Sequence, residues 1–347
     1  MIDSSRRSAD GAKADLSRWP ALVLTAGLAT RLQPLSQVRA KAALPVAGEA
    51  LVVRILRTLR AAGVTRVVLN LHHRAETITR QVGDGSALGL SVRYSWETEV
   101  LGSAGGPARA LPLLEADRFL IVNGDTIADV ALAALAAQHV ATNALVTMAV
   151  VDADPRYNAI LADDNGIVSG FTSSTPGPPA LAAERASFGA VAPERPPAAK
   201  ADTPGTYHFI GVQAVNAAAF AGVSPDRRSE TVHGLYPALI AQRPGSLRIM
   251  PTTAEFFDIG TPRDYLATAT RLAEREGQPL DRGHGCRVAA DAHLDGTILW
   301  NDVTIGPGTS LTRCVVADGV TVPSGAHHVE CSLVMRDNEV VAEPFRN

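Results

Sequence analysis

The chain has 347 residues, of which 46% are hydrophobic and 19% are charged, and its formal net charge is −3. This length and apolar content are ample for a sizeable core and exceed one average domain. There is no basic excess, no basic run and no apolar run long enough to span a bilayer, so we expect no nucleic-acid partner and no membrane partner.

Residues 1–19 are mostly polar and lack the apolar core of a signal peptide, so we expect a flexible N-terminal tail. The three cysteines, Cys286, Cys314 and Cys331, are widely and unevenly spaced. This spacing fits neither a disulfide framework nor a zinc site. It is typical of reduced, structural thiols in a cytoplasmic protein.

Apolar runs and helical periodicity alternate along most of the chain. Buried strands are predicted at 21–24, 67–71, 90–94, 119–122, 145–151 and 207–215, and helices at 51–62, 75–82, 130–140 and 264–276. Strands that alternate with helices imply βαβ units and therefore a Rossmann-like α/β fold with a doubly wound, mainly parallel sheet. Ligands of such sheets bind at the carboxyl ends of the strands.

Two later segments depart from this pattern. Residues 172–206 are rich in Pro and Ala without a clear period, which predicts a surface loop or insertion. Within residues 281–347, apolar residues recur in steps of six, as at Val288, Leu294 and Trp300. Such hexads favour a parallel β-helix over an irregular β-rich tail. We therefore expect a catalytic domain at 20–280 and a hexapeptide-repeat domain after it.

The first strand breaks at once into a turn of small residues, followed by Arg31 and then by Lys41. Small residues let a backbone approach a ligand closely and leave N–H groups free to bind an anion. The two side chains add positive charge, one forked and one point-like. This combination predicts a phosphate site, whereas the alternative is a tight turn with a solvated arginine.

This turn resembles the signature loop of the sugar-1-phosphate nucleotidyltransferases, which reads A-G-x-G-T-R-L-x-P-L followed by P-K-P-L-x-P-V. The matching segments are 26–35 and 40–46. Among the departures from the signature, Ala29 replaces a glycine, where a methyl group could crowd a phosphate or strain the loop, and Ala40 replaces the proline before the lysine. The resemblance implies nucleotide contacts from Ala26, Gly27, Leu28 and Thr30.

Three further segments match the family in the same order. Gly102-Ser103-Ala104-Gly105-Gly106 resembles its L-G-T-A-G segment, which implies that Gly102, Ala104 and Gly105 lie against the nucleotide. We read the segment as a loop, and we place Glu97 and Glu99 just before it on a solvated loop.

The other two segments each supply a carboxylate. Asp125 follows an apolar strand and Asn123-Gly124, and it matches the G-D metal position of the family. Asp258 lies in a segment that resembles W-x-D-x-G-T-P. An aspartate between apolar residues is expensive to bury without a partner, and a metal would supply one. The resemblance therefore implies that both carboxylates hold Mg²⁺.

Two segments match the parts of the family that lie near the sugar, and both matches are partial. Asn158 lies in the place of a glycine in a segment that matches Y-G-V, and Gly211 matches an f-x-G segment. The resemblance implies that both residues contact the sugar. The family's Glu-Lys-Pro segment is absent, and residues 171–173 lie in its place. The resemblance therefore does not imply which sugar 1-phosphate this protein accepts.

The resemblance implies an enzyme that forms an NDP-sugar and pyrophosphate from an NTP and a sugar 1-phosphate, with Mg²⁺ as cofactor. Arg31 would hold the β- and γ-phosphates, and Lys41 would bridge the α-phosphate and the attacking phosphate. The β-helix favours the guanylyltransferases that act on mannose 1-phosphate, and therefore GTP. The catalytic half also resembles uridylyltransferases that act on N-acetylmuramate 1-phosphate, which leaves UTP as the alternative.

The sequence leaves two alternatives to an enzymatic function, and it suggests a surface for assembly. A non-catalytic regulatory subunit that binds a nucleotide sugar is the main rival, motivated by Ala29 and Asn158. A hexapeptide-repeat scaffold with a purely structural front domain would leave the matched motifs unexplained. The apolar faces of the hexads make the β-helix a plausible surface for a homo-oligomer.

Overall fold

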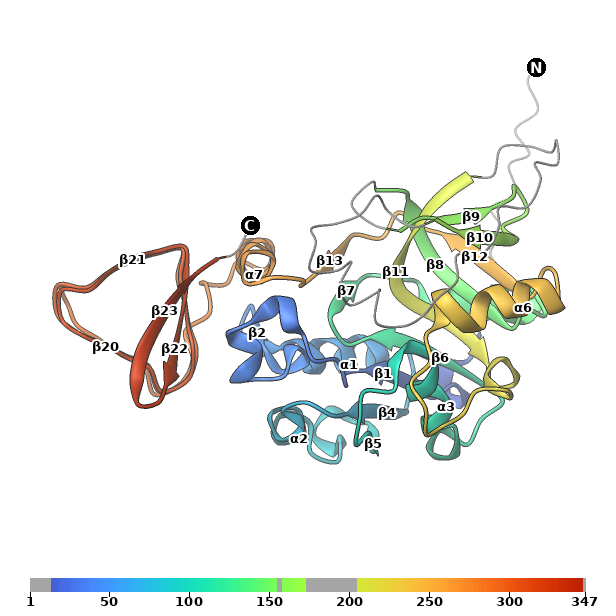
Figure 1. Ribbon diagram of the computed structural model, residues 1–347, viewed down its shortest axis with the longest axis horizontal. Coiled ribbons are helices and arrows are strands. Elements are labelled where there is room, and N and C mark those ends of the chain that lie inside the picture. Colours follow the sequence, from blue (N-terminus) through green and yellow to red (C-terminus); the bar gives the residue numbers. More distant parts are fainter. Residues whose placement is uncertain (1–13, 155–157, 173–204, 346–347) are drawn as a thin grey trace, which may run out of the picture.

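A computed structural model describes residues 14–154, 158–172 and 205–345 (Figure 1). We call residues 14–276 the α/β unit and residues 287–344 the β-helix. Helix α7 (Pro262–Glu276) is the last element of the α/β unit, and Figure 1 shows it between the central sheet and the β-helix. The predicted insertion lies almost wholly outside the described residues.

The α/β unit is built on a mixed sheet of nine strands. Four of them run parallel in the order β5-β4-β1-β6, and β11 then pairs antiparallel with β6 and β8. Its strands are β1 (Ala21–Leu24), β4 (Arg66–Leu71), β5 (Ser91–Trp96), β6 (Arg118–Asn123), β8 (Val146–Asp152), β9 (Ile160–Ala162), β10 (Val168–Phe171), β11 (Gly205–Asn216) and β12 (Leu247–Pro251). The predicted strands are confirmed, with antiparallel pairs at one side of the parallel core.

Two small antiparallel pairs accompany this sheet, namely the hairpin of β2 (Pro45–Val46) with β3 (Glu49–Ala50) and the long-range pair of β7 (Thr126–Ala128) with β13 (Phe256–Asp258). The other helices within the described residues are α1 (Leu51–Ala61), α2 (Ala75–Val82), α3 (Gly102–Leu114), α4 (Leu132–Thr142) and α6 (Tyr236–Gln242). Short 3₁₀ turns cover 16–18, 30–32, 35–37, 41–43, 86–88 and 217–220, and a π-helical turn covers 231–235. Among the described residues, no helix is both long and apolar enough to cross a membrane.

Helix α3 corrects one expectation from the sequence. The small residues at 102–106 form its first turns rather than a loop, although Pro107 and Pro112 also lie inside it. Packing outweighs this poor helix propensity, because Ala104 and Ala108 are buried in one apolar cluster with Leu22 of β1. Helix α7, predicted at 264–276, begins two residues earlier at Pro262, with Thr261 as its N-cap and a capping box between Thr261 and Asp264.

Residues 14–19, which we expected in the tail, pack onto the α/β unit. Leu16 is buried, and Trp19 lies edge-on to the buried ring of His139. The backbone N–H of Ala14 donates to the carbonyl of Ala133. Only residues 1–13 of the expected tail fall outside the described part of the chain.

The β-helix consists of short parallel strands stacked in three sheets, which give the triangular section seen in Figure 1. Val288 pairs with Ile305 and Ile305 with Val322, so each coil takes 17 residues. The hexads therefore predict the right architecture. Each coil is one residue shorter than three full hexads would make it. Cys314 and Cys331 lie here and Cys286 lies just before β14, and all three are free thiols.

The strands of the β-helix are β14 (Arg287–Val288), β15 (His293–Asp295), β16 (Ile298–Leu299), β17 (Thr304–Ile305), β18 (Ser310–Thr312), β19 (Val315–Val316), β20 (Thr321–Val322), β21 (His327–Val329), β22 (Cys331–Arg336) and β23 (Glu339–Pro344). The last two form an antiparallel pair that ends the stack. Its interior is apolar because Ile305, Leu311 and Val316 are almost fully buried.

Leu311 offers a test of this interior. It is fully buried and stacks between Leu294 and His328 of the neighbouring coils. We expect Leu311→Ala to lower the free energy of unfolding of the β-helix by about 2–5 kcal/mol, because it leaves a cavity. Val329→Ala, at a side chain that is 64% exposed, should change it by less than about 0.5 kcal/mol. Urea unfolding followed by the fluorescence of Trp300 measures both, and equal effects would contradict the described packing.

Candidate functional site

A pocket of about 310 Å³ lies at the carboxyl ends of β1 and β6. This is the edge of the sheet where ligands of doubly wound folds bind. Six of the residues singled out from the sequence line it, namely Gly27, Leu28, Thr30, Arg31, Lys41 and Asp125. The structure therefore brings the signature loop, both cations and the first carboxylate to one place.

The signature loop presents backbone to this pocket. A side chain added at Gly27 would meet no atom within 4 Å, so the backbone there is open to a ligand. Ala29 has a φ of 49° and a ψ of 47°, which is the left-handed region that the family's glycine adopts easily. An alanine there costs about 1–2 kcal/mol, so the loop keeps the shape in spite of its methyl group. Ala26 is buried beneath the loop and does not line the pocket.

Lys41 lies between two carboxylates. Its Nζ is 2.8 Å from Oδ2 of Asp125 and 3.9 Å from Oδ1 of Asp258. The lysine side chain is only 13% exposed, whereas the aspartates are 41% and 28% exposed. The ammonium group of Lys41 is thus enclosed by protein, whereas both carboxylates remain partly accessible to solvent.

The pairing of β13 with β7 brings Asp258 to this position. Asp258 lies opposite Thr126 in the antiparallel register, and the backbone N–H of Ile259 donates to the carbonyl of Asp125. Burial raises the pKa of Asp258 above its ordinary value, and Asp125 adds to the rise, while Lys41 and Arg31 oppose it. A cation at this point would relieve the repulsion between the two carboxylates.

The residues present fit a Mg²⁺ ion. Within the described residues, no group of three or more His, Cys, Asp or Glu side chains could enclose a metal. Mg²⁺ does not need one, because it is usually bound by one or two carboxylates together with substrate phosphates and water. Asp125 and Asp258 supply such a pair beside a pocket that also carries Arg31.

A buried polar chain supports the floor of the pocket. Asn70 accepts from the backbone N–H of Thr25 at 2.7 Å and donates to Glu97 at 2.7 Å, and Glu97 accepts from the backbone N–H of Leu101 at 2.9 Å. The expectation that Glu97 is solvated is therefore wrong, since the residue is only 5% exposed. Its neighbour Glu99 is exposed, as expected.

The small residues at the start of α3 face protein rather than the pocket. The N–H groups of Ala104 and Gly105 donate to the carbonyl of Ser229. Gly102 has a φ of 77°, and a Cβ there would lie 2.6 Å from the same carbonyl oxygen. None of these three residues lines the pocket. They hold the segment 227–230 close to the sheet.

This segment carries a site residue that the sequence reading missed. Arg228 lines the pocket, and its Nε lies 3.2 Å from Oε1 of Glu230. Glu230 in turn accepts from the backbone N–H and the hydroxyl of Ser103. The only signal in the sequence is a pair of adjacent arginines in a loop, which does not by itself indicate where the loop folds.

The two residues expected on the sugar side do not line the pocket. Gly211 has a φ of 79° in β11, and a Cβ there would lie 3.1 Å from Cβ of Asn123. It is therefore a close neighbour of the strand end that carries Asp125. Asn158 is half-buried in the segment before β9.

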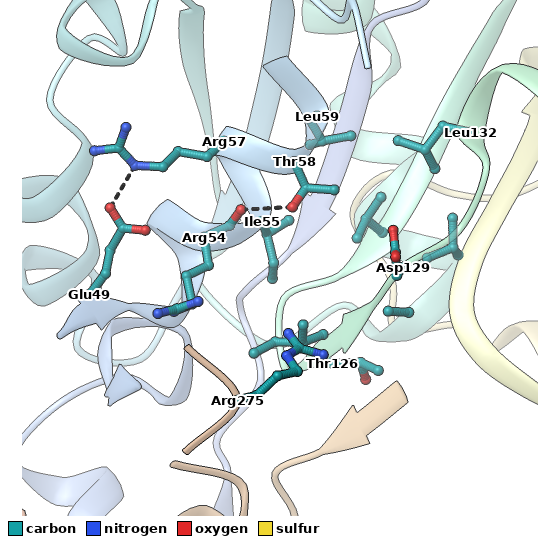
Figure 2. Close-up of a pocket in the computed structure, with 14 residues that line it drawn as sticks. Glu49, Arg54, Ile55, Arg57, Thr58, Leu59, Thr126, Asp129, Leu132 and Arg275 are labelled. Atoms are coloured by element: carbon teal, nitrogen blue, oxygen red, sulfur yellow. Dashed lines mark hydrogen bonds and ion pairs between the residues drawn. The ribbon is translucent and has the colours of Figure 1, made fainter. Parts of the chain in front are cut away.

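A second pocket, of about 430 Å³, lies between α1, β7 and α4 (Figure 2). It is lined by apolar side chains such as Ile55, Leu59 and Leu132. Its arginines already have carboxylate partners: Arg54 pairs with Glu276, Arg57 with Glu49 as drawn in Figure 2, and Arg275 with Glu255. The smaller pocket, with its loop and paired aspartates, is the better site for a triphosphate.

Comparisons with known proteins show which family the chain resembles. The chain is 30% identical to the mannose-1-phosphate guanylyltransferase of Mycobacterium tuberculosis, over 88% of this chain and 81% of that protein. It is 42% identical to the N-acetylmuramate alpha-1-phosphate uridylyltransferase of Neisseria meningitidis, over 32% of this chain and 48% of that protein.

A similar fold occurs in solved structures. The crystal structure of HddC from Yersinia pseudotuberculosis has a TM-score of 0.57 and 20% identity, and covers 73% of this chain and 99% of HddC. Residues 20–275 match the family described as nucleotidyl transferase. The chain is therefore a member of the nucleotidyl transferase family.

Proposed function

We propose that the protein joins an NTP and a sugar 1-phosphate into an NDP-sugar and releases pyrophosphate. The observation that carries this proposal is the convergence of Arg31, Lys41 and Asp125 on one pocket, with Asp258 beside them at 3.9 Å from Nζ of Lys41. Phosphoryl-transfer chemistry of this kind needs positioning and charge neutralisation more than a protein nucleophile.

Each side chain has a distinct part in the proposed reaction. An oxygen of the sugar phosphate attacks the α-phosphorus, and the bond from that phosphorus to the pyrophosphate oxygen breaks. Arg31, exposed at the loop, holds the β- and γ-phosphates and stabilises the charge of the departing pyrophosphate. Lys41 contacts the α-phosphate and the attacking phosphate, and its carboxylate partners fix its position in advance.

Asp125 and Asp258 would hold Mg²⁺, which neutralises phosphate charge when bound. Arg228 faces the same pocket from the opposite segment and adds a third cation for the substrate phosphates. The open backbone at Gly27 lies where a nucleotide can approach it closely. These features together supply the anion site that two phosphate-bearing substrates require.

For the base and the sugar, we propose GTP and mannose 1-phosphate. The support is the extent of the similarity to the M. tuberculosis guanylyltransferase, which at 88% of this chain is longer than the α/β unit alone. UTP with an N-acetylmuramate-type sugar 1-phosphate is the second candidate, supported by the higher identity over a shorter segment. A regulatory subunit that binds without turnover is the third.

The direct test is pyrophosphate release from purified protein and Mg²⁺, with each of the four NTPs and a panel of sugar 1-phosphates. We expect release with GTP and mannose 1-phosphate, and a fall of about 10²- to 10³-fold in kcat for Arg31→Ala, because a preorganised cation is lost. A preference for UTP would overturn the choice of base. Unchanged turnover in Arg31→Ala would overturn the assignment of the site.

The metal assignment predicts a shift in the Mg²⁺ requirement. Asp125→Asn and Asp258→Asn should each raise the Mg²⁺ concentration for half-maximal rate by about tenfold or more, since a carboxylate ligand is lost. Asp129→Asn makes the same charge change at an exposed residue of the second pocket and should leave the requirement unchanged. Equal behaviour of the three variants in a Mg²⁺ titration would contradict the assignment.

Ala29→Gly separates a catalytic protein from a regulatory one. Because the loop already has the left-handed conformation, we expect turnover to change by less than about threefold and the free energy of unfolding to rise by about 1 kcal/mol or less. Ala47→Gly, at a φ of 48° outside the pocket, is the matched control for stability. A large gain in rate confined to Ala29→Gly would instead indicate that the natural loop impairs catalysis.

A further inference from the structure

The segment that carries Lys41 is fastened at both ends to the C-terminal part of the chain. At its start, Arg39 forms two hydrogen bonds with Asp318 of the β-helix, at 2.7 and 2.6 Å. At its end, the carbonyl of Pro45 accepts from the hydroxyl of Tyr265, and that hydroxyl accepts from Nε1 of Trp300 at 3.1 Å. Lys41 therefore lies between two contacts that lead to the β-helix.

The Arg39 contact is unusually well enclosed. The arginine side chain is 8% exposed, and its guanidinium lies 5.0 Å from the ring centroid of Trp300. Asp318 also accepts from the backbone N–H of Asn301 at 3.0 Å, so both partners are fixed by the first coils of the β-helix. A bidentate pair of this kind sets direction as well as distance.

The backbone between these contacts has little freedom. A 3₁₀ turn spans Lys41–Ala43, and the N–H of Ala40 donates to the hydroxyl of Thr77 at 3.0 Å. Ala42 and Ala43 are both buried in the same apolar cluster. A movement of Arg39 is therefore transmitted to Lys41, two residues away, rather than absorbed by a flexible loop.

We propose that Arg39 is a positioning residue, and that the β-helix, through Asp318, sets the place of Lys41 in the active site. This inference rests on the proposed role of Lys41 in the transfer reaction. It gives the β-helix a direct part in catalysis within one chain, in addition to any part in assembly. The motifs of the α/β unit do not by themselves predict this role of the β-helix. The contact between Arg39 and Asp318 forms only when the coils of the β-helix pack against residues 39–48.

Asp318→Asn and Glu330→Gln form a matched pair for the test. Both residues are in the β-helix, and their side chains are 33% and 32% exposed. Glu330 pairs with Arg263 of α7, so it also links the β-helix to the α/β unit, but away from the Lys41 segment. A general loosening of the two parts would affect both variants alike.

With the NTP and sugar 1-phosphate that the wild-type protein turns over, we expect Asp318→Asn to lower kcat by about 10- to 100-fold. The KM for the sugar 1-phosphate should rise while the KM for the NTP stays within about twofold, because Arg31 and the loop still hold the triphosphate. Glu330→Gln should change none of these constants by more than about twofold. A smaller folded fraction would lower kcat alone and leave both KM values unchanged.

The double variant Arg39→Gln/Asp318→Asn should lose no more activity than Asp318→Asn, since the pair acts as one unit. Amide hydrogen exchange of residues 39–46 should be about fivefold faster in Asp318→Asn than in Glu330→Gln. Unchanged exchange, or equal kinetic losses in the two single variants, would overturn the proposal. If the wild-type protein turns over no substrate pair, the proposed function fails, and the exchange rates alone decide whether Asp318 positions the segment.

Discussion

The pairing of β13 with β7 is the constraint on which the candidate site depends. It sets Asp258 opposite Thr126 and so brings a carboxylate from near the end of the α/β unit beside Asp125 and Lys41. Like charges this close are unfavourable unless a cation lies between them. Lys41 supplies that cation in the protein alone, and bound metal and phosphates would complete the balance when substrates are present.

A second set of contacts fixes the signature loop relative to the cluster of Lys41, Asp125 and Asp258. The chain Thr25–Asn70–Glu97–Leu101 ties the ends of three parallel strands to the start of α3. Helix α3 then holds the segment that carries Arg228 through the carbonyl of Ser229. The candidate site residues therefore lie on elements whose positions are fixed by buried hydrogen bonds, which is the condition for electrostatic preorganisation.

Much of the fold and the main site residues could be predicted from the sequence, because apolar periodicity and short motifs are local. The hexads predicted the β-helix, and the signature loop predicted that Arg31 and Lys41 lie together, as they do in lining one pocket. Features that depend on distant partners could not be read in this way. Glu97 looks solvated until Asn70 is placed beside it, and residues 102–106 look like a loop until apolar packing compensates for their composition. The positions of Arg39 and Arg228 likewise depend on partners far away in the sequence.

The central claim is that this pocket transfers a nucleotidyl group to a sugar phosphate. It is tested most directly by following the label from GTP that carries ³²P at the α-phosphate or at the γ-phosphate, in the presence of mannose 1-phosphate and Mg²⁺. The account predicts that the α-label appears in the sugar nucleotide and the γ-label in pyrophosphate, at equal rates. Label that remains in GTP, or γ-label released as inorganic phosphate, would contradict it.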